Sequence, residues 1–313
     1  MKEEQQITDR YTLADLEKWS EVTRDVDPPI RLGVFGDPVA HSLSPEMQNA
    51  ALRESNIDMQ YALFQIAPDE LEPAIRLMRE LGFVGLNLTV PHKIAALPFV
   101  DEIEEQATKI GAINTIVFRE NKSSGWNTDG PGFARAIREE FSVDLRDLRV
   151  LLLGAGGGAG RAVAYQCALE NCERLVLVDR TFEKAQALAR ELANCFSGPR
   201  VLGPEARLAA SRWNDSELRT QLGRTDLVVN ATTVGLKHSD PSPLSQALIA
   251  PHLMIYDLIY RQTPTALLGA AASAGARGAN GLTMLLHQGA LAFELWFDRP
   301  APFAAMRAAL TRK

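Results

Sequence analysis

The stretch RVLLLGAGGGAGRAVA, residues 149–164, constrains the fold of this chain more than any other. Its first half is an apolar run typical of a buried strand, and its second half has the pattern of a helix. In a dinucleotide-binding βαβ unit, one glycine permits the tight turn, a second lets the backbone approach a pyrophosphate, and a third lets the helix pack on the strand. Gly154, Gly156 and Ala159 match the pattern G-x-G-x-x-A.

The residues around this loop strengthen the interpretation. A helix is expected at 160–171 and a second strand, RLVLVD, at 174–179, so an acidic residue, Asp179, ends that strand. Strand, loop, helix and acidic strand end together predict a dinucleotide site. Asp179 suits the ribose diol of NAD and would repel the 2′-phosphate of NADP, whereas Arg180, Thr181 and Lys184 would attract that phosphate. Both cofactors therefore stay open at this point.

Short apolar strands alternate with helices along most of the chain, which predicts an α/β fold with mainly parallel sheets. Strands are expected at 30–36, 61–66, 83–90, 112–120, 123–129, 149–154, 174–179, 226–232 and 254–260. Helices are expected at 12–22, 44–55, 69–82, 131–141, 160–171, 182–193, 265–275, 284–297 and 302–310, with a further helix opening at PHK.

Composition excludes several classes of protein. The 313 residues fit about two domains. A net charge of −6 argues against nucleic-acid binding. We find no run of roughly 18 apolar residues that could cross a membrane, and the acidic N-terminus is unlike a signal peptide. The three cysteines lack C-x-x-C spacing, which favours reduced thiols in the cytoplasm. The histidines are not spaced like metal ligands, so we expect no metal site.

Several polar residues lie where strand and helix patterns do not explain them. They fall in the motifs GDPVAHSLSP, NLTVPHK, GAINT and GWNTDGPGF of the first half, in NATTVG and DLIY of the second, and in GLTMLLHQ near the end. In this order, the motifs closely resemble those of the shikimate dehydrogenase family, from about Ile30 to Trp296.

The resemblance implies a two-domain enzyme that reversibly reduces 3-dehydroshikimate to shikimate with NADPH, on the route to chorismate and aromatic amino acids. An N-terminal, mostly parallel α/β domain would bind substrate, a Rossmann-like domain would bind the cofactor, and the C-terminal helices would return to the substrate domain. We assign a leader to residues 1–29, the substrate domain to 30–133 with 282–313, and the dinucleotide domain to 134–281.

The resemblance also implies which residues form the sites. Ser42 and Ser44 would donate hydrogen bonds to the carboxylate of shikimate. Amides donate and accept, which suits ring hydroxyls. The remaining implied substrate contacts are Asn87, Thr89, Lys93, Asn114, Asp129, Tyr260 and Gln288. The implied cofactor contacts are Gly154, Ala155, Gly156, Gly157, Gly158, Asp179, Arg180, Thr181, Lys184, Thr232, Leu258 and Gly281.

Lys93 and Asp129 are the implied catalytic pair. A lysine ammonium can polarise the ketone and donate a proton during reduction, and the amine can accept it during oxidation. An ordinary lysine, with a pKa near 10.4, is a poor base at neutral pH. Burial would favour the neutral form of such a lysine, whereas a neighbouring carboxylate would favour the charged form. The pair, and not one base alone, is therefore the hypothesis.

Structural roles compete with these assignments. Serines before a helix commonly cap it, Asp129 could cap the helix that begins near Pro131, and Gln288 could be a buried hydrogen-bonding residue. Lys93 could be a solvated lysine in a first helical turn, but a cation is poorly placed there, which favours a special role.

The chain departs from the family at two cofactor positions. Its loop GAGGGAGRA has one residue more than the family's GAGGAGRA, and Asp179 stands where the family commonly has asparagine. An NAD-using quinate/shikimate dehydrogenase is therefore a close alternative, and a non-catalytic quinate- or shikimate-binding sensor is a different class of alternative. We expect a small-molecule substrate, no nucleic-acid or membrane partner, and a monomer or homodimer.

Overall fold

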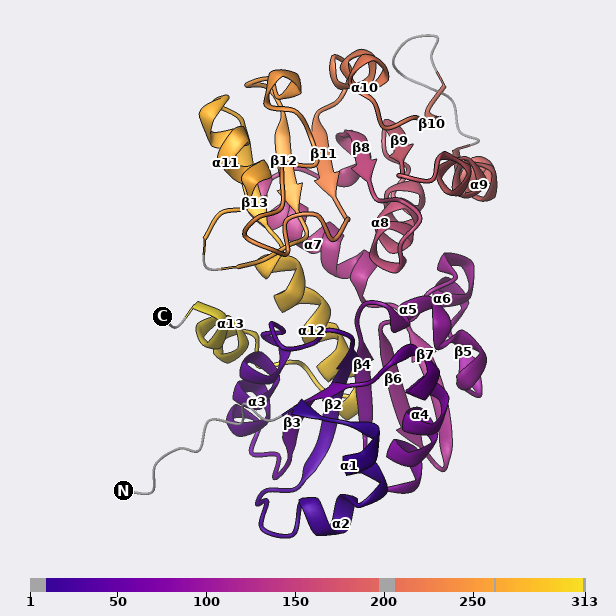
Figure 1. The fold of residues 1–313 in the computed structure, drawn as a ribbon, viewed down its shortest axis with the longest axis vertical. Coiled ribbons are helices and arrows are strands. Elements are labelled where there is room, and N and C mark those ends of the chain that lie inside the picture. Colours follow the sequence, from indigo (N-terminus) through magenta and orange to yellow (C-terminus); the bar gives the residue numbers. More distant parts are fainter. Residues whose placement is uncertain (1–9, 197–205, 262, 312–313) are drawn as a thin grey trace. The chain divides into compact units, whose positions relative to one another are not determined.

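The computed structural model describes residues 10–196, 206–261 and 263–311 of the chain. It divides into two compact units (Figure 1). Unit 1 is Met1–Thr128 with Gln288–Lys313, and unit 2 is Asp129–His287. The divisions differ by a few residues from the domain limits assigned from the sequence, since 129–133 and 282–287 belong to unit 2.

Unit 1 contains a seven-stranded sheet in the order β1-β3-β2-β4-β6-β7-β5. The first four strands in this order are parallel, while β6 pairs antiparallel with both β4 and β7. The strands are β1 (Arg10–Tyr11), β2 (Ile30–Gly36), β3 (Gln60–Gln65), β4 (Gly85–Leu88), β5 (Glu102–Ile103), β6 (Thr115–Arg119) and β7 (Lys122–Trp126).

The helices of unit 1 include one from the far end of the chain. The helix α13 packs beside α3, which joins the C-terminal segment to the first third of the sequence (Figure 1). The helices are α1 (Leu13–Glu17), α2 (Trp19–Val22), α3 (Ser44–Glu54), α4 (Leu71–Glu80), α5 (His92–Ala95), α6 (Glu105–Ile110) and α13 (Phe303–Thr311), with 3₁₀ turns at Pro68–Glu70 and Leu97–Phe99.

The described part of the predicted leader belongs to unit 1. Its strand β1 pairs with β3, and Trp19 is buried against Phe64 and Phe83. The single helix expected at 12–22 is two short helices, because the backbone at Lys18 leaves the helical conformation (φ −118°, ψ 26°). Residues 1–9 of the leader lie outside the described residues.

Unit 2 contains a six-stranded, entirely parallel sheet in the order β10-β9-β8-β11-β12-β13. This is the doubly wound arrangement of a Rossmann fold. The strands are β8 (Arg149–Leu153), β9 (Arg174–Val178), β10 (Leu208–Ser211), β11 (Leu227–Asn230), β12 (Met254–Asp257) and β13 (Arg277–Asn280). The fold class predicted from the sequence is confirmed.

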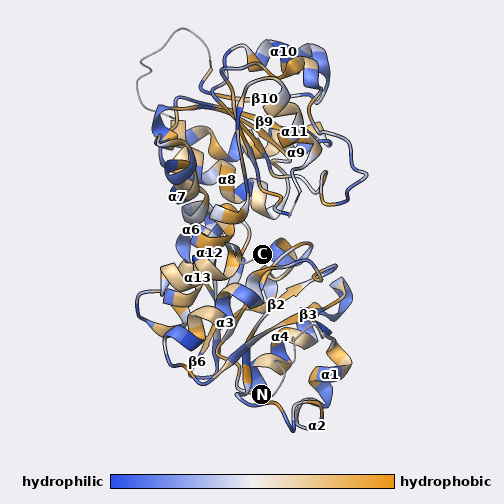
Figure 2. Ribbon diagram, turned by 90° about the vertical axis from the view of Figure 1, so that its left-hand side faces the viewer, coloured by the Kyte–Doolittle hydropathy of each residue, from blue (hydrophilic) through white to orange (hydrophobic). Residues whose placement is uncertain are grey.

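Both faces of the unit 2 sheet are covered by apolar cores. Figure 2 shows the strands in the middle of this unit mostly in orange, whereas the outer helix α10 is largely blue. The helices are α7 (Asp129–Phe141), α8 (Gly158–Leu169), α9 (Phe182–Leu192), α10 (Asp215–Leu222), α11 (Ala266–Ser273) and α12 (Leu282–Phe297), with 3₁₀ turns at Leu145–Asp147, Ala193–Phe196 and Gln246–Leu248. α12 continues past His287 into unit 1.

Candidate active site

The predicted cofactor residues lie at one edge of the unit 2 sheet. Because the strands are parallel, their carboxyl ends meet at the same edge. The glycine loop follows β8, and the other predicted residues follow the neighbouring strands. Asp179, Arg180 and Thr181 follow β9, Lys184 lies in the first turn of α9, Thr232 follows β11, Leu258 follows β12, and Gly281 follows β13.

Two glycines of the loop are required by its geometry. Gly154 has φ +84°, a conformation that favours glycine. A Cβ on Gly160 would lie 2.1 Å from the carbonyl oxygen of Gly154, so α8 approaches the end of β8 backbone to backbone. Gly160 therefore provides the close helix-to-strand contact that the sequence analysis had assigned to Ala159, and that assignment was wrong. The loop has the spacing G-x-G-x-x-x-G.

Three residues of the loop lie between Gly156 and Gly160. Gly157 is the N-cap of α8, and Gly158 is the first residue of that helix. A Cβ on Gly157 would meet nothing closer than 3.7 Å, so this position has room for a side chain.

Asp179 holds the glycine loop. One carboxylate oxygen accepts a hydrogen bond from the Gly156 amide at 2.9 Å, and the other accepts one from the Thr181 amide at 2.9 Å. The Lys184 side chain also packs against the loop here: it lies 3.0 Å from where a Cβ on Gly156 would be, so Gly156 has little room for a side chain. Arg180, Thr181 and Lys184 are exposed.

The loops after β11 and β12 are joined by buried polar groups. Asp257 accepts hydrogen bonds from Asn230 (2.9 Å) and Thr265 (2.6 Å), and Asn230 accepts two from Thr232. Burial raises the pKa of the Asp257 carboxyl, against the lowering effect of these hydrogen bonds. Gly281 is needed beside them, because a Cβ there would collide with the carbonyl oxygen of Leu258.

This edge fits a dinucleotide. The amides at the start of α8 can bind a pyrophosphate, and the exposed Gly157 has no side chain to obstruct it. The site lies at the carboxyl ends of β8 and β11, where the strand order reverses, which is the usual ligand position in such sheets.

In unit 1, three predicted substrate residues share one buried hydrogen-bond network. Asn114 donates to Gln288 at 3.1 Å, and Asn87 donates to the carbonyl oxygen of Asn114 at 3.2 Å. Thr115 and Thr128 complete the network. The Asn87 side-chain amide donates to the Thr115 hydroxyl. The Asn114 side chain donates through its nitrogen to the Thr128 hydroxyl and accepts at its oxygen from the Thr128 backbone amide.

The two threonines and Tyr61 were missed as network members by the sequence analysis. The Tyr61 hydroxyl donates to Asn87 at 2.8 Å. Thr115 and Thr128 belong to the quoted motifs GAINT and GWNTDGPGF. The pairing of β6 with β4 places Thr115 opposite Asn87, and the pairing of β6 with β7 brings the segment of Thr128 beside Thr115; neither register can be seen in the sequence.

Ser42 and Ser44 stand at the start of α3. Ser44 is buried, and its amide donates to the Ser42 hydroxyl at 3.3 Å. This is a local bond just before the helix and not a helix cap, since the N-cap of α3 is Leu43 and no side chain caps it. It uses the Ser42 oxygen as an acceptor and leaves the Ser42 hydroxyl proton available for another partner.

The backbone around Lys93, which follows β4, is bonded to residues beside two other strands, β6 and β3. The amide of Ile113 donates to the Lys93 carbonyl at 2.8 Å. The preceding residue, His92, is buried, and its Nε2 contacts the carbonyl oxygen of Ile66 after β3 at 2.8 Å. Burial lowers the pKa of His92, against smaller raising effects of the Ile66 carbonyl and Asp37. His92 is therefore a neutral imidazole that donates from Nε2.

The loops after β2 and β4 also bond directly. The Asp37 amide donates to the Val90 carbonyl at 3.0 Å, and the Thr89 amide donates to the Phe35 carbonyl at 2.9 Å. A Cβ on Gly36 would lie 2.5 Å from the Thr89 methyl group. The segments that carry the serines and Lys93 are thereby joined within unit 1.

The other predicted residues of the substrate site belong to unit 2. Asp129 is the first residue of α7 and is 3% exposed. Tyr260 is half-buried after β12.

Comparison with known proteins identifies the family. Residues 34–116 match the shikimate dehydrogenase substrate-binding domain, and residues 281–311 match the shikimate 5′-dehydrogenase C-terminal domain. The chain is 43% identical to shikimate dehydrogenase (NADP(+)) of Methanopyrus kandleri over 89% of this chain and 94% of that protein. The chain belongs to the shikimate dehydrogenase family.

Solved structures of similar chains include two with bound cofactors. Shikimate 5-dehydrogenase of Thermus thermophilus, in complex with NADP(H) and shikimate, has a TM-score of 0.77 and 36% identity, and the match covers 90% of this chain and 98% of that one. Quinate dehydrogenase of Corynebacterium glutamicum, in complex with NAD, also has a TM-score of 0.77, with 30% identity and coverage of 90% and 98%. The resemblance stated from the sequence motifs is confirmed.

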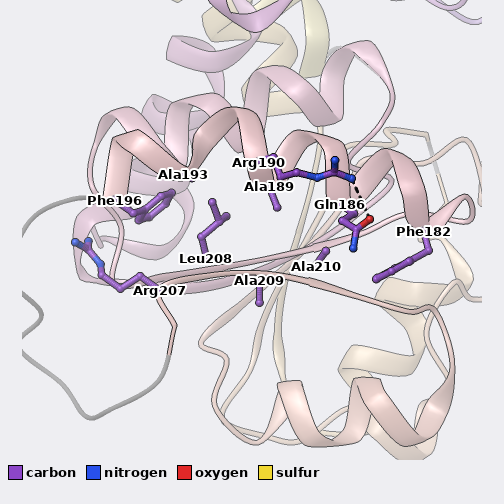
Figure 3. Close-up of a pocket in the computed structure, with 10 residues that line it drawn as sticks. All are labelled: Phe182, Gln186, Ala189, Arg190, Ala193, Phe196, Arg207, Leu208, Ala209 and Ala210. Atoms are coloured by element: carbon purple, nitrogen blue, oxygen red, sulfur yellow. Dashed lines mark hydrogen bonds between the residues drawn. The ribbon is translucent and has the colours of Figure 1, made fainter.

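Unit 2 also has a groove of about 470 Å³. It runs between α9 and β10, with Phe182 at one end and Phe196 and Arg207 at the other (Figure 3). None of the predicted site residues lines it, although Phe182 directly follows the predicted cofactor residue Thr181.

The described residues offer neither a cluster of metal ligands nor a membrane-spanning helix. Within 10–196, 206–261 and 263–311, no three His, Cys, Asp or Glu side chains are grouped so that they could hold a metal ion. In the same ranges, every helix is too short or too polar to span a bilayer.

The glycine loop gives a testable contrast. Gly160→Ala should weaken NADP binding on the order of 10-fold or more, because the new methyl group would collide with the Gly154 carbonyl. Gly157→Ala should leave the affinity within about 2-fold, because its nearest neighbour is at 3.7 Å. Calorimetric titration with NADP measures both; equal effects of the two variants would contradict this geometry.

His92 should make stability depend on pH. Its folded-state pKa is lowered from 6.5, so below pH 6.5 the unfolded state binds a proton that the folded state excludes. Stability should therefore fall as pH drops below 6.5, with a slope of at most about 1.4 kcal/mol per pH unit. Urea unfolding at several pH values measures it. His92→Phe should reduce the slope in this range, and an unchanged slope would refute the role of His92.

Proposed function

We propose that this chain is an NADP-dependent shikimate dehydrogenase, which reversibly reduces 3-dehydroshikimate to shikimate. Two features of this chain support the proposal together. Its glycine loop fits a pyrophosphate, and its buried amide network is built from the motif residues of the family to which it belongs. The class is an oxidoreductase acting on a CH–OH group, in the pathway to chorismate and aromatic amino acids.

The unit 1 network is proposed to receive the ring hydroxyls of the substrate. Asn87 and Asn114 already donate to Thr115, Thr128, Gln288 and a carbonyl group. Side chains that are already hydrogen-bonded need little reorganisation when a ligand binds. The network would therefore keep the side-chain amides of Asn87 and Asn114 oriented for the substrate hydroxyls. Thr89 and Tyr260 are proposed to complete the substrate contacts.

Ser42 and Ser44 are proposed to bind the substrate carboxylate. A hydroxyl donates to an anionic oxygen in a charge-assisted hydrogen bond. The Ser42 oxygen accepts the Ser44 amide, which orients the Ser42 hydroxyl proton away from that amide. The local bond between Ser44 and Ser42 would therefore aim a donor.

Lys93 and Asp129 are proposed to manage the proton. A bound nicotinamide supplies the hydride, so the protein needs to bind the substrate and move a proton at its oxygen. The Lys93 ammonium would polarise the ketone oxygen and protonate it as the alcohol forms. The Asp129 carboxylate would hold that ammonium in the charged form. His92 and the Ile113 amide fix the backbone from which Lys93 extends.

NADP is the proposed cofactor, and NAD is the alternative. The NADP(+) name of the Methanopyrus kandleri relative, and the exposed cations Arg180 and Lys184, favour NADP. Asp179 favours NAD in an ordinary dinucleotide site, but here both of its oxygens already accept amide groups of the protein. An NAD-using quinate/shikimate dehydrogenase is the second candidate function.

The small-molecule substrate is shikimate or its ketone in this proposal. A cytoplasmic location and a monomeric or homodimeric state stay predictions from the sequence.

A matrix of steady-state kinetics tests the proposed function. Oxidation of shikimate and of quinate is measured with NADP and with NAD. We expect the highest kcat/KM for shikimate with NADP. The highest kcat/KM for quinate with NAD would favour the second candidate, and no turnover of either substrate would contradict both.

Lys93→Ala should lower kcat on the order of 100-fold or more, since general acid–base catalysis contributes at least this much. The KM for shikimate should change little, because the proposed role is at the reacting oxygen. Lys18→Ala, which changes an exposed lysine of the same unit, is the matched control and should keep full activity. Near-normal kcat in the Lys93 variant would remove Lys93 from the mechanism.

A further inference from the structure

Arg212 lies beside Asp179 at the carboxyl edge of the unit 2 sheet. The parallel strands β9 and β10 pair in register, with Val178 opposite Ser211. The next residues along the two strands, Asp179 and Arg212, therefore follow neighbouring strand ends. Asp179 is the residue whose position corresponds to the adenosine ribose in dinucleotide sites of this kind.

The side chain of Arg212 leans over the start of α9. Its guanidinium carbon lies 4.5 Å from the ring centroid of Phe182, closer than in any other arginine–phenylalanine stack of the described residues. Phe182 is the first residue of α9 and directly follows Thr181. The stack thus places a cation next to the segment that carries Arg180, Thr181 and Lys184.

The backbone under Arg212 is fixed on both sides. The Arg212 amide donates to the Glu217 carboxylate at 2.8 Å, and the neighbouring Trp213 indole donates to the Pro243 carbonyl at 3.1 Å. Glu217 therefore accepts from the main chain of Arg212, and its carboxylate also lies within electrostatic reach of the guanidinium. Among the described residues the guanidinium makes no hydrogen bond of its own, so the stack on Phe182 orients donors that are still available.

Such a guanidinium suits a phosphate. A planar guanidinium can donate two parallel hydrogen bonds to one phosphate group, and stacking on a ring reduces the rotamer freedom that binding must remove. Asp179 presents a negative charge at the same strand ends, and a second anion there requires compensation. Arg180 and Lys184 are exposed, and among the described residues no hydrogen bond or ion pair fixes the end of either side chain.

We propose that Arg212 is a specificity-determining residue that binds the 2′-phosphate of NADP and offsets the charge of Asp179. This inference rests on the proposed use of a dinucleotide cofactor. The Arg212–Phe182 stack holds the guanidinium ready before the cofactor arrives, so the preference for a 2′-phosphate depends on a residue from β10 as well as on the segment after β9.

Direct binding of adenosine 2′,5′-bisphosphate and of adenosine 5′-monophosphate to the full chain tests this without catalysis. Arg212→Gln should weaken the bisphosphate on the order of 10-fold, in keeping with the loss of a hydrogen bond to a charged group. Binding of the monophosphate should stay within about 2-fold. Arg219→Gln changes an exposed arginine of α10 and is the matched control, with no effect on either ligand.

Phe182→Leu is the second variant. It keeps the guanidinium but removes the ring, so it should weaken the bisphosphate by about 3-fold, less than Arg212→Gln. Equal losses for bisphosphate and monophosphate in Arg212→Gln would mean a general disturbance of the adenosine site and would overturn the proposal. Unchanged bisphosphate binding would overturn it too.

The kinetic matrix separates this inference from the proposed function. A wild-type chain that oxidises shikimate but binds the bisphosphate no more tightly than the monophosphate would overturn the role of Arg212 and keep the dehydrogenase assignment. A chain that shows the expected loss in Arg212→Gln but no turnover of shikimate would keep the phosphate site and overturn the assignment of substrate.

Discussion

Parallel pairing of strands is the constraint on which both units depend. It brings the ends of β8, β9, β11, β12 and β13 to one edge of unit 2, and the ends of β2, β3 and β4 to one edge of unit 1. Most strand interiors are apolar and contribute to the cores, although those of β7 and β13 do not. The glycine loop and most of the predicted site residues lie where strands stop, beside backbone amides that the sheet leaves unpaired.

Unit 1 shows how such an edge is made rigid. Its loops do not simply leave the sheet: Asp37 bonds Val90, His92 bonds Ile66, and Thr89 bonds Phe35. Asn87 sits one step inside the edge and has hydrogen-bond partners for its amide nitrogen and its oxygen. A buried amide without partners would cost stability, so a network of this kind restricts each member to one orientation.

The sequence predicted much of this because the periodic elements are long and the motifs are ordered. The limits of β2 and β8 and the starts of α3 and α9 agree with the expected ones within a residue. The strands β10 and β13, with sequences LAAS and RGAN, were missed, because they are short and their side chains carry almost no strand preference. Arg212, which we propose as a site residue, was missed with them, since its place depends on the register of β10. Ala159 fitted the expected glycine spacing by coincidence, and only the contact between Gly160 and Gly154 shows which residue packs on the strand.

The carboxylate of Asp179 has a consequence for how this loop could change. Its two oxygens receive amides from two different segments, the lengthened loop and the turn before α9. Asparagine at this position would have one acceptor oxygen and would turn an NH₂ group toward one of those amides. The carboxylate thus joins the glycine loop to the turn before α9, so a change at this one position would alter both segments together.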